Sequence, residues 1–243
     1  MENCSPAINW RKALDIAALH EIVLKQGWLS QAPRWFQSGV LDRCQLRHFK
    51  TGESIYSIGD PPGGMFGLAA GGLNVSIAPN ERGPYFTHVA GPGSWFGEAA
   101  AFTGQPRRVG LRAARDSELL HLPLHGIREI VDNNPVAWRY FALVTIGHLD
   151  VTIGAHDDLM IRDHVKRCIA VLLRLGGCRL SSPPDSLPVE IDVSQEDIAL
   201  MSNVARTTAG AVLRKIEAMG HLEQSYHRIR ILAPDALRAM LLD

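Results

Sequence analysis

The spacing of hydrophobic residues changes along this chain at about residue 40 and again at residue 134. Residues 1–30 have helical spacing that ends near Gly27. Between residues 40 and 125 the apolar runs are short and interrupted by Gly and Pro, which is typical of antiparallel strands in a sandwich or barrel. Helical spacing returns after residue 134. The pattern therefore predicts a β-rich unit followed by a helical one.

One long helix is predicted to begin at Asn134-Pro135, because Asn suits an N-cap and Pro the first helical position. It carries two apolar stripes. The first contains Ala137, Phe141, Val144, Val151 and Ala155, and the second Trp138, Ala142, Leu149 and Leu159. A helix that is apolar on two sides needs two partners. One is its own sandwich, and the other is either the same helix of a second subunit or more of the same chain. We favour a homodimer.

The C-terminal part predicts two further helices and a hairpin. An amphipathic helix over 161–175 ends at Gly176-Gly177. Ser194 and Asp197 then have the spacing of a capping box at the start of a short helix. A tight break precedes a second helix over 206–220. A short helix, a turn and a helix that exposes small and polar residues indicate a helix-turn-helix.

Five residues of the second helix are candidates for contact with double-stranded DNA: Arg206, Thr207, Thr208, Ala211 and Arg214. Small side chains allow close approach to the major groove, where Arg reads guanine and Thr contacts a base or a thymine methyl. Residues 222–232 predict a wing whose tip, Tyr226-His227-Arg228, places Arg228 on phosphate. The alternative is a helical hairpin packed on the sandwich, which the lack of acidic residues on the exposed face disfavours.

Composition adds limits on location and chemistry. The 243 residues favour two domains, and 25 basic residues balance 25 acidic ones. No run of eighteen apolar residues and no secretory signal occur, so we expect a cytoplasmic protein without a membrane segment. The four cysteines form no C-x-x-C pair, which argues against an iron–sulfur sensor. Residues 203–232 contain five Lys and Arg but only two Glu, and this local positive charge is a weak sign of nucleic-acid binding.

The segment WFGEAAAFTGQPRRVG, residues 95–110, separates Gly97-Glu98 from Arg107-Arg108 by small residues. A surface salt bridge would account for these charges. An anion cradle would also account for the small residues, which expose backbone N–H groups to a ligand. A guanidinium adds charge-assisted hydrogen bonds.

These pieces, in this order, resemble the Crp/Fnr family of bacterial transcription regulators. The resemblance covers residues 35–235 and rests on FGEAAAFTGQPR at 96–107 and DIALMSNVARTTAGAVLRKIE at 197–217. It implies an α+β chain: an N-terminal helix and antiparallel β-roll or jelly roll (1–133), a dimerisation helix (134–160) and a winged helix-turn-helix (161–243).

The resemblance also implies an effector site. Glu98 would accept the ribose 2′-hydroxyl of a cyclic nucleotide, cAMP or cGMP, and Arg107 would pair with its phosphate. Backbone amides of Gly97, Ala99 and Ala100 would surround the ligand. Thr152 on the long helix would touch the base, and no metal is implied.

The sequence departs from the family pattern at several of these positions. Arg108 stands where a small residue is usual, so a second guanidinium either fills the site or favours a more highly charged anion. Ile153 replaces a second hydroxyl beside Thr152. Thr207 and Ala211 replace a Glu and an Arg that often read the half-site, so we expect a different operator.

The sequence leaves three other functions to compare with this one. A metal enzyme or triad hydrolase lacks its motifs, so no catalytic residues are assigned. A haem or redox sensor of the same fold would use His148 as an axial ligand, although a lone His on a helix is more often hydrogen-bonded. An effector-independent regulator of this fold is the third. RNA polymerase is an expected partner of any of them.

Overall fold

The computed structural model describes residues 16–78, 85–181 and 188–242. The first half of the helix expected over 1–30 lies outside these ranges, and its second half is α1 (Ile16–Lys25). Gly27 follows it with a positive φ of 77°. A Cβ at Gly27 would lie 2.0 Å from the Gly93 carbonyl oxygen, so only glycine allows this contact between the helix end and the sheet.

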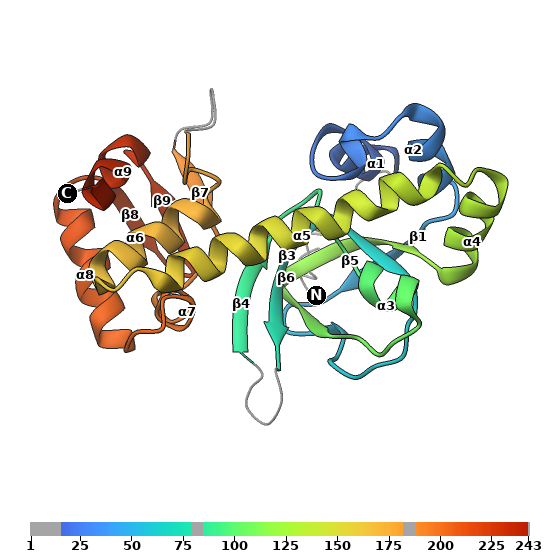
Figure 1. The fold of residues 1–243 in the computed structure, drawn as a ribbon. Coiled ribbons are helices and arrows are strands. Elements are labelled where there is room, and N and C mark those ends of the chain that lie inside the picture. The colour runs from blue at the N-terminus through green and yellow to red at the C-terminus, as the bar shows by residue number, and fades with distance from the viewer. Residues whose placement is uncertain (1–15, 79–84, 182–187, 243) are drawn as a thin grey trace, which may run out of the picture.

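An antiparallel sheet forms the N-terminal lobe, as the Gly- and Pro-interrupted runs predict (Figure 1). Its strands are β1 (Gln45–Phe49), β2 (Ser54–Tyr56), β3 (Met65–Ile77), β4 (Tyr85–Ala90), β5 (Trp95–Phe96) and β6 (Val109–Leu122). The order is β1-β6-β3-β4, with β2 on β6 and β5 on β3. The two longest strands, β3 and β6, pair along their length and form the spine of the roll.

Short helices cover one end of this roll. They are η1 (Leu29–Gln31), α2 (Arg34–Leu41), α3 (Glu98–Thr103) and α4 (Leu124–Asn133). Apolar periodicity did not predict them, because each spans ten residues or fewer. They bury an aromatic cluster around Trp28, whose ring lies 5.4 Å from Trp95 and 5.8 Å from Phe141. The Trp28 indole N–H also donates to the Tyr140 carbonyl oxygen at 2.6 Å.

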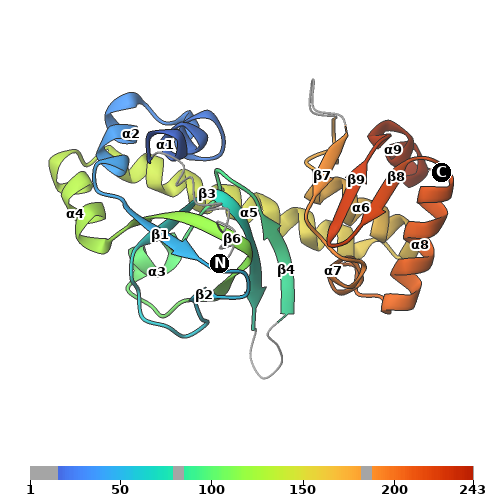
Figure 2. The same cartoon turned by 180° about the vertical axis from the view of Figure 1, so that it is seen from behind.

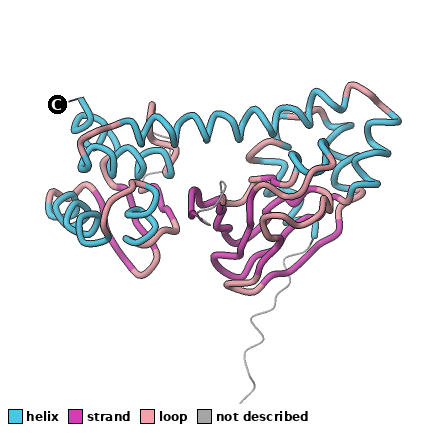
Figure 3. The backbone as a smooth tube through the Cα atoms, turned by 60° about the horizontal axis from the view of Figure 1, so that its bottom comes forward, coloured by secondary structure: helices cyan, strands magenta, loops and turns pink. Residues whose placement is uncertain are grey.

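The long helix α5 (Ala137–Met160) runs from the aromatic cluster to the C-terminal lobe (Figures 1 and 3). It starts two residues after Pro135, which lies in the preceding turn. Ala137, Phe141 and Val144 of the first apolar stripe are buried against the helix's own roll. The second stripe is exposed, with Leu149 51% accessible. Val151, also expected in the first stripe, is 37% exposed, so the single chain covers that stripe only along the first half of α5 and leaves the second stripe open.

The C-terminal lobe combines helices with a three-stranded sheet (Figure 2). The elements are α6 (His164–Leu175), β7 (Val189–Ile191), α7 (Gln195–Met201), α8 (Arg206–Ala218), β8 (Leu222–Ser225), β9 (Arg228–Ile231) and α9 (Pro234–Leu242). The sheet order is β7-β9-β8, so the expected hairpin gains a third strand that the sequence did not predict. These elements share one hydrophobic core.

The two lobes also touch directly. Phe86 and Val89 on β4 pack against the core of the C-terminal lobe, and β4 lies against α7. Arg115 on β6 pairs with Asp192, beyond β7, at 2.6 Å. The N-terminal roll is thus connected to the helix-turn-helix through α5 and through this second contact.

Candidate effector and DNA-binding sites

Five residues form what we call the cradle: Tyr56, Gly64, Gly97, Glu98 and Arg107. The chain enters it from β5 through Gly97, whose φ of 106° is left-handed. A Cβ there would lie 2.4 Å from Arg107 Nη1 and 2.5 Å from the Gly64 carbonyl oxygen. Glycine at this position therefore satisfies both the backbone conformation and the close approach of the arginine.

Arg107 lies inside the roll and is 4% exposed. Its guanidinium donates to the carbonyl oxygens of Gly97 at 3.2 Å and Gly64 at 2.9 Å, and lies 4.2 Å from the Tyr56 ring centroid. Its Nε has no hydrogen-bond acceptor, and no ion pair among the described residues involves it. Burial lowers the pKa of Arg107, since desolvation disfavours its charge.

Glu98 begins α3 and is 6% exposed. Its Oε1 lies 2.8 Å from Nδ1 of His148, which comes from the middle of α5. The His148 ring also stacks on Phe96, with 4.9 Å between centroids and 17° between planes. His148, the candidate axial ligand on the long helix, is thus hydrogen-bonded to the carboxylate that was expected to receive a ribose hydroxyl.

The other expected effector residues are placed differently. Ala99 and Ala100 lie in the first turn of α3, where amides have no intrahelical acceptor. Arg108 is exposed, so it does not fill the cradle. Thr152 is exposed one turn beyond His148, and its hydroxyl donates to the His148 carbonyl oxygen at 2.8 Å. The structure therefore brings Gly97, Glu98 and Arg107 together, but not Arg108 or Thr152.

Sequence reasoning missed Tyr56 and Phe96 and left open how His148 is used. Tyr56 faces Arg107 from the end of β2, and its hydroxyl is buried without a partner. Burial raises the pKa of that hydroxyl. Tyr56 has no sequence signal, because it looks like an ordinary strand aromatic until β2 pairs with β6. Phe96 directly precedes Gly97 and begins the quoted motif, so its place beside the cradle follows from the sequence.

The expected helix-turn-helix is formed by α7, a four-residue turn and α8. The Ser194 hydroxyl accepts from the Asp197 amide at 3.1 Å, and Asp197 Oδ2 accepts from the Ser194 amide at 2.7 Å, which is the predicted capping box. Gly210, expected beside the exposed residues, is instead buried against α7. A Cβ there would lie 3.0 Å from Gln195 Oε1, so the glycine allows the close crossing of the two helices.

The outward face of α8 carries most of the expected DNA contacts. Arg206, Thr207, Ala211 and Arg214 are exposed, while Thr208 is half-buried. Arg206 is within 3.7 Å of Glu196, an exposed pair that costs little to separate. Ala209, Val212, Leu213 and Ile216 are buried on the opposite face. Met219, expected on that face, is largely exposed.

The wing is held to α8 by a polar network. Gln224 on β8 donates through its amide N–H to Glu217 Oε1 at 2.7 Å and through Nε2 to Glu217 Oε2 at 2.8 Å. Gln195 on α7 donates to Gln224 Oε1 at 2.9 Å. The tip consists of Tyr226, which is exposed, and His227, whose φ is 53°. This network fixes the wing relative to the recognition helix.

Arg228 follows the tip rather than lying at it. As the first residue of β9 it contacts Glu190 at 3.2 Å and Asp192 at 3.5 Å, both on the β7 side of the sheet. The expected phosphate contact would replace these partly exposed ion pairs. Asp192 also binds Arg115 of the roll, so the lobe contact and the wing share one carboxylate.

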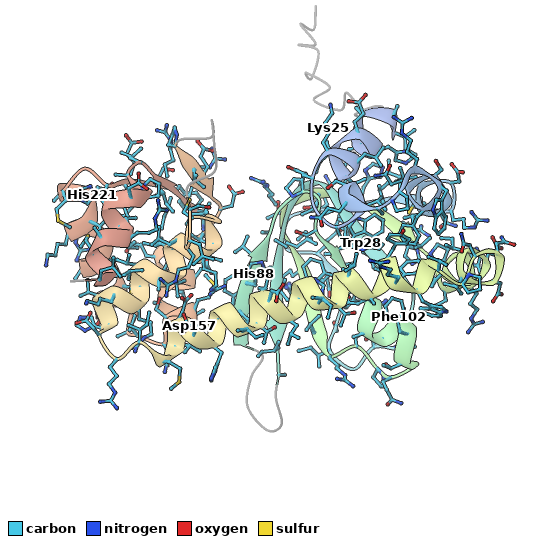
Figure 4. All side chains as sticks on the ribbon, turned by 45° about the horizontal axis from the view of Figure 1, so that its top comes forward. Lys25, Trp28, His88, Phe102, Asp157 and His221 are labelled. Carbon is cyan, nitrogen blue, oxygen red and sulfur yellow. The ribbon has the colours of Figure 1, made fainter. Side chains whose placement is uncertain are left out.

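Two ionisable side chains, those of Asp158 and His88, lie where α5 meets the C-terminal lobe. Asp158 accepts from Arg174 Nε on α6 at 2.7 Å and lies 3.4 Å from Arg179 Nε. His88 of β4 lies beside the middle of α5 (Figure 4). Burial, then the nearby charges of Arg174 and His148, lower the pKa of His88 to about 4. A neutral histidine therefore lies at the junction of the roll, α5 and α6.

Two observations on the described residues concern the alternative functions. Over the described ranges, no cluster of three or more His, Cys, Asp or Glu could hold a metal ion. In the same part of the chain, no helix is long and apolar enough to cross a membrane. Nδ1 of His148, the candidate haem ligand, is engaged by Glu98.

Comparison with known proteins finds a family model for each half of the chain. The family model "Cyclic nucleotide-binding domain" matches residues 46–134, and "Crp-like helix-turn-helix domain" matches 166–240. A CRP-like cAMP-activated global transcriptional regulator of Mycobacterium tuberculosis is 24% identical over 196 residues, covering 80% of this chain and 87% of that protein.

Solved structures show the same fold. The c-di-GMP responsive global regulator CLP of Xanthomonas campestris superposes with a TM-score of 0.63 at 20% identity, over 82% of this chain and 99% of that one. A CRP/FNR family transcriptional regulator of Thermus thermophilus superposes with a TM-score of 0.61 at 22% identity, over 82% and 99%. With both family models matched in order around α5, this chain belongs to the Crp/Fnr family of transcription regulators.

Proposed function

We propose that this protein is a homodimeric, cytoplasmic regulator whose cradle binds a cyclic nucleotide monophosphate and thereby changes its affinity for operator DNA. Domain boundaries at residues 134 and 161 fit this division of labour. The observation that carries the effector assignment is Arg107, a buried guanidinium that hydrogen-bonds only to backbone carbonyls and forms no ion pair among the described residues, although the charges of Glu98 and Asp60 act on it from further away. A bound phosphate would supply the missing negative charge and accept paired hydrogen bonds.

The other cradle residues complete the recognition of such a ligand. Glu98 would accept a ribose hydroxyl, and the amides of Gly97, Ala99 and Ala100 would face the phosphate. Thr152 would reach the base only from a partner subunit or after a rearrangement, because here its hydroxyl is bound to its own helix. A relative named as cAMP-activated supports this class of ligand, and a neighbour named as c-di-GMP responsive supports only a nucleotide effector in the wider sense.

Calorimetric titration with cAMP and with cGMP tests the effector assignment. Glu98→Gln and Arg107→Lys should each weaken binding by about tenfold or more, since both keep size but lose a charge or the planar fork. Arg108→Ala is the matched control, because its side chain is exposed next to Arg107. Equal binding by all four proteins would contradict the assignment.

The DNA-binding half is tested on duplexes selected from a random pool. Replacement of Arg206 or Arg214 by Ala should cost about 1–3 kcal/mol and relax specificity at one base pair. Arg228→Ala should weaken all sequences about equally and lower the salt slope by about one. Unchanged affinity after both helix substitutions would show that α8 is not the reading helix. Contact with RNA polymerase at the bound promoter completes the proposed role.

A further inference from the structure

His148 is the residue that joins the cradle to the long helix. Its Nδ1 lies 2.8 Å from Glu98 Oε1, and its ring is stacked 4.9 Å from that of Phe96. The side chain of Glu98 is 8% exposed and that of His148 32%. The imidazole therefore covers the carboxylate on the side from which α5 approaches it.

This contact satisfies the group that a ligand hydroxyl would need. A buried carboxylate without partners is costly, so some donor must face Glu98 when the site holds no effector. The ring of His148 supplies an N–H donor, and its flat face covers Phe96, an aromatic surface on which a base could stack. One side chain thus reproduces two contacts that a nucleoside would make.

We propose that His148 is a built-in competitor for the cradle, which an effector must displace from Glu98, and that this displacement is what transmits occupancy to α5. The inference rests on the proposed function and adds the regulation of that site. It assigns to one side chain both a reduction of effector affinity and the coupling to DNA.

The position of His148 on α5 connects it to the DNA-binding lobe. It lies between the exposed residues Ile146 and Leu149, so a change in its setting alters the face available to a partner helix. Ten residues further on, Asp158 binds Arg174 of α6. His88 lies within electrostatic range of both His148 and Arg174. Movement of α5 therefore reaches α6 through a buried ion pair.

The test is calorimetric titration of the full-length protein with cAMP and cGMP. His148→Ala should bind the nucleotide about tenfold tighter than wild type, because no side chain then competes for Glu98. His148→Gln keeps a donor for Glu98, so its nucleotide affinity should lie closer to that of wild type than to that of His148→Ala. Thr145→Ala, an exposed change on the same helix, is the control and should behave as wild type.

The second readout is the response of DNA affinity to the nucleotide. His148→Ala should bind ligand yet lose most of the change in DNA affinity that the ligand causes in wild type. Equal or weaker nucleotide binding by His148→Ala, in a variant with native circular dichroism, would overturn the inference and leave the effector site standing. Binding by neither wild type nor any His148 variant would instead overturn the proposed function itself.

Discussion

The Asp158 carboxylate, 1% exposed, accepts a hydrogen bond from Arg174 Nε at 2.7 Å and so fastens the end of α5 to α6. Asp158→Ala should lower the free energy of unfolding by about 3 kcal/mol, because it leaves Arg174 buried without its acid. Urea unfolding measures this. Asp157→Ala is a matched control: that side chain is 70% exposed and its loss should cost less than about 1 kcal/mol. Similar losses for the two variants would show that the buried pair has no special role.

The exposed face of α5 has the spacing of a coiled-coil seam. Residues separated alternately by four and three positions are all exposed: Ala142, Ile146, Leu149, Ile153, His156 and Met160. Leu149→Asp should therefore give folded monomers in sedimentation, because a charge in the seam opposes pairing. Thr145→Asp lies beside the seam and should stay dimeric. A dimeric Leu149→Asp would remove α5 from the interface.

Phe141 lies on the opposite, buried face of that helix. It is 0% exposed and lies within the aromatic cluster, so Phe141→Asp should unfold the N-terminal lobe rather than dissociate a folded dimer. Circular dichroism distinguishes these results. A native spectrum for this variant would contradict the assignment of the first stripe to the core.

The cradle depends on glycine at residue 97. Gly97→Ala should cost about 1–3 kcal/mol in urea unfolding, since the new Cβ would overlap Arg107 and the backbone is left-handed. Gly104→Ala has a similar φ of 68° with open space around it, so it should cost only about 1 kcal/mol. A larger loss at residue 104 would mean that the close approach of Arg107 is unimportant.

The lowered pKa of His88 predicts that the folded protein loses stability in acid. Its pKa of about 4 lies below the ordinary 6.5, so the unfolded chain binds its proton first as pH falls. Its contribution to stability is full above about pH 6.5 and is lost as pH falls towards about 4, by up to about 3 kcal/mol. Urea unfolding across this range should show a flatter profile for His88→Gln than for wild type. An exposed substitution, His48→Gln, should keep the wild-type profile.

The fold was predictable from the sequence where a hydrophobic pattern, a run of turn residues or a helix cap is present. The Gly- and Pro-interrupted strands, the two-sided helix and the capping box at Ser194 each reflect local backbone preferences, and the structure confirms them. Short helices such as η1 and α3 have too few turns for their periodicity to be recognised. Strand β7 was missed because three residues give no alternation to read.

The candidate site was only partly predictable. The motif places Gly97, Glu98 and Arg107 within eleven residues of one another, so their proximity follows from one loop. The pairing of Glu98 with His148 spans fifty residues and depends on how α5 crosses the roll. Likewise, Tyr56 reaches Arg107 only because β2 pairs with β6. Tertiary packing determines such contacts, and the local sequence does not encode them.

The central claim is that the cradle and the DNA-binding lobe are thermodynamically linked, and reciprocity tests it most directly. The dissociation constant for a selected duplex is measured with and without saturating cyclic nucleotide, and that for nucleotide with and without saturating duplex. The account predicts that the two ratios are equal, with a coupling of about 1–3 kcal/mol, and that both fall to one in Glu98→Gln. Nucleotide binding that leaves duplex affinity unchanged in the wild-type protein would contradict it.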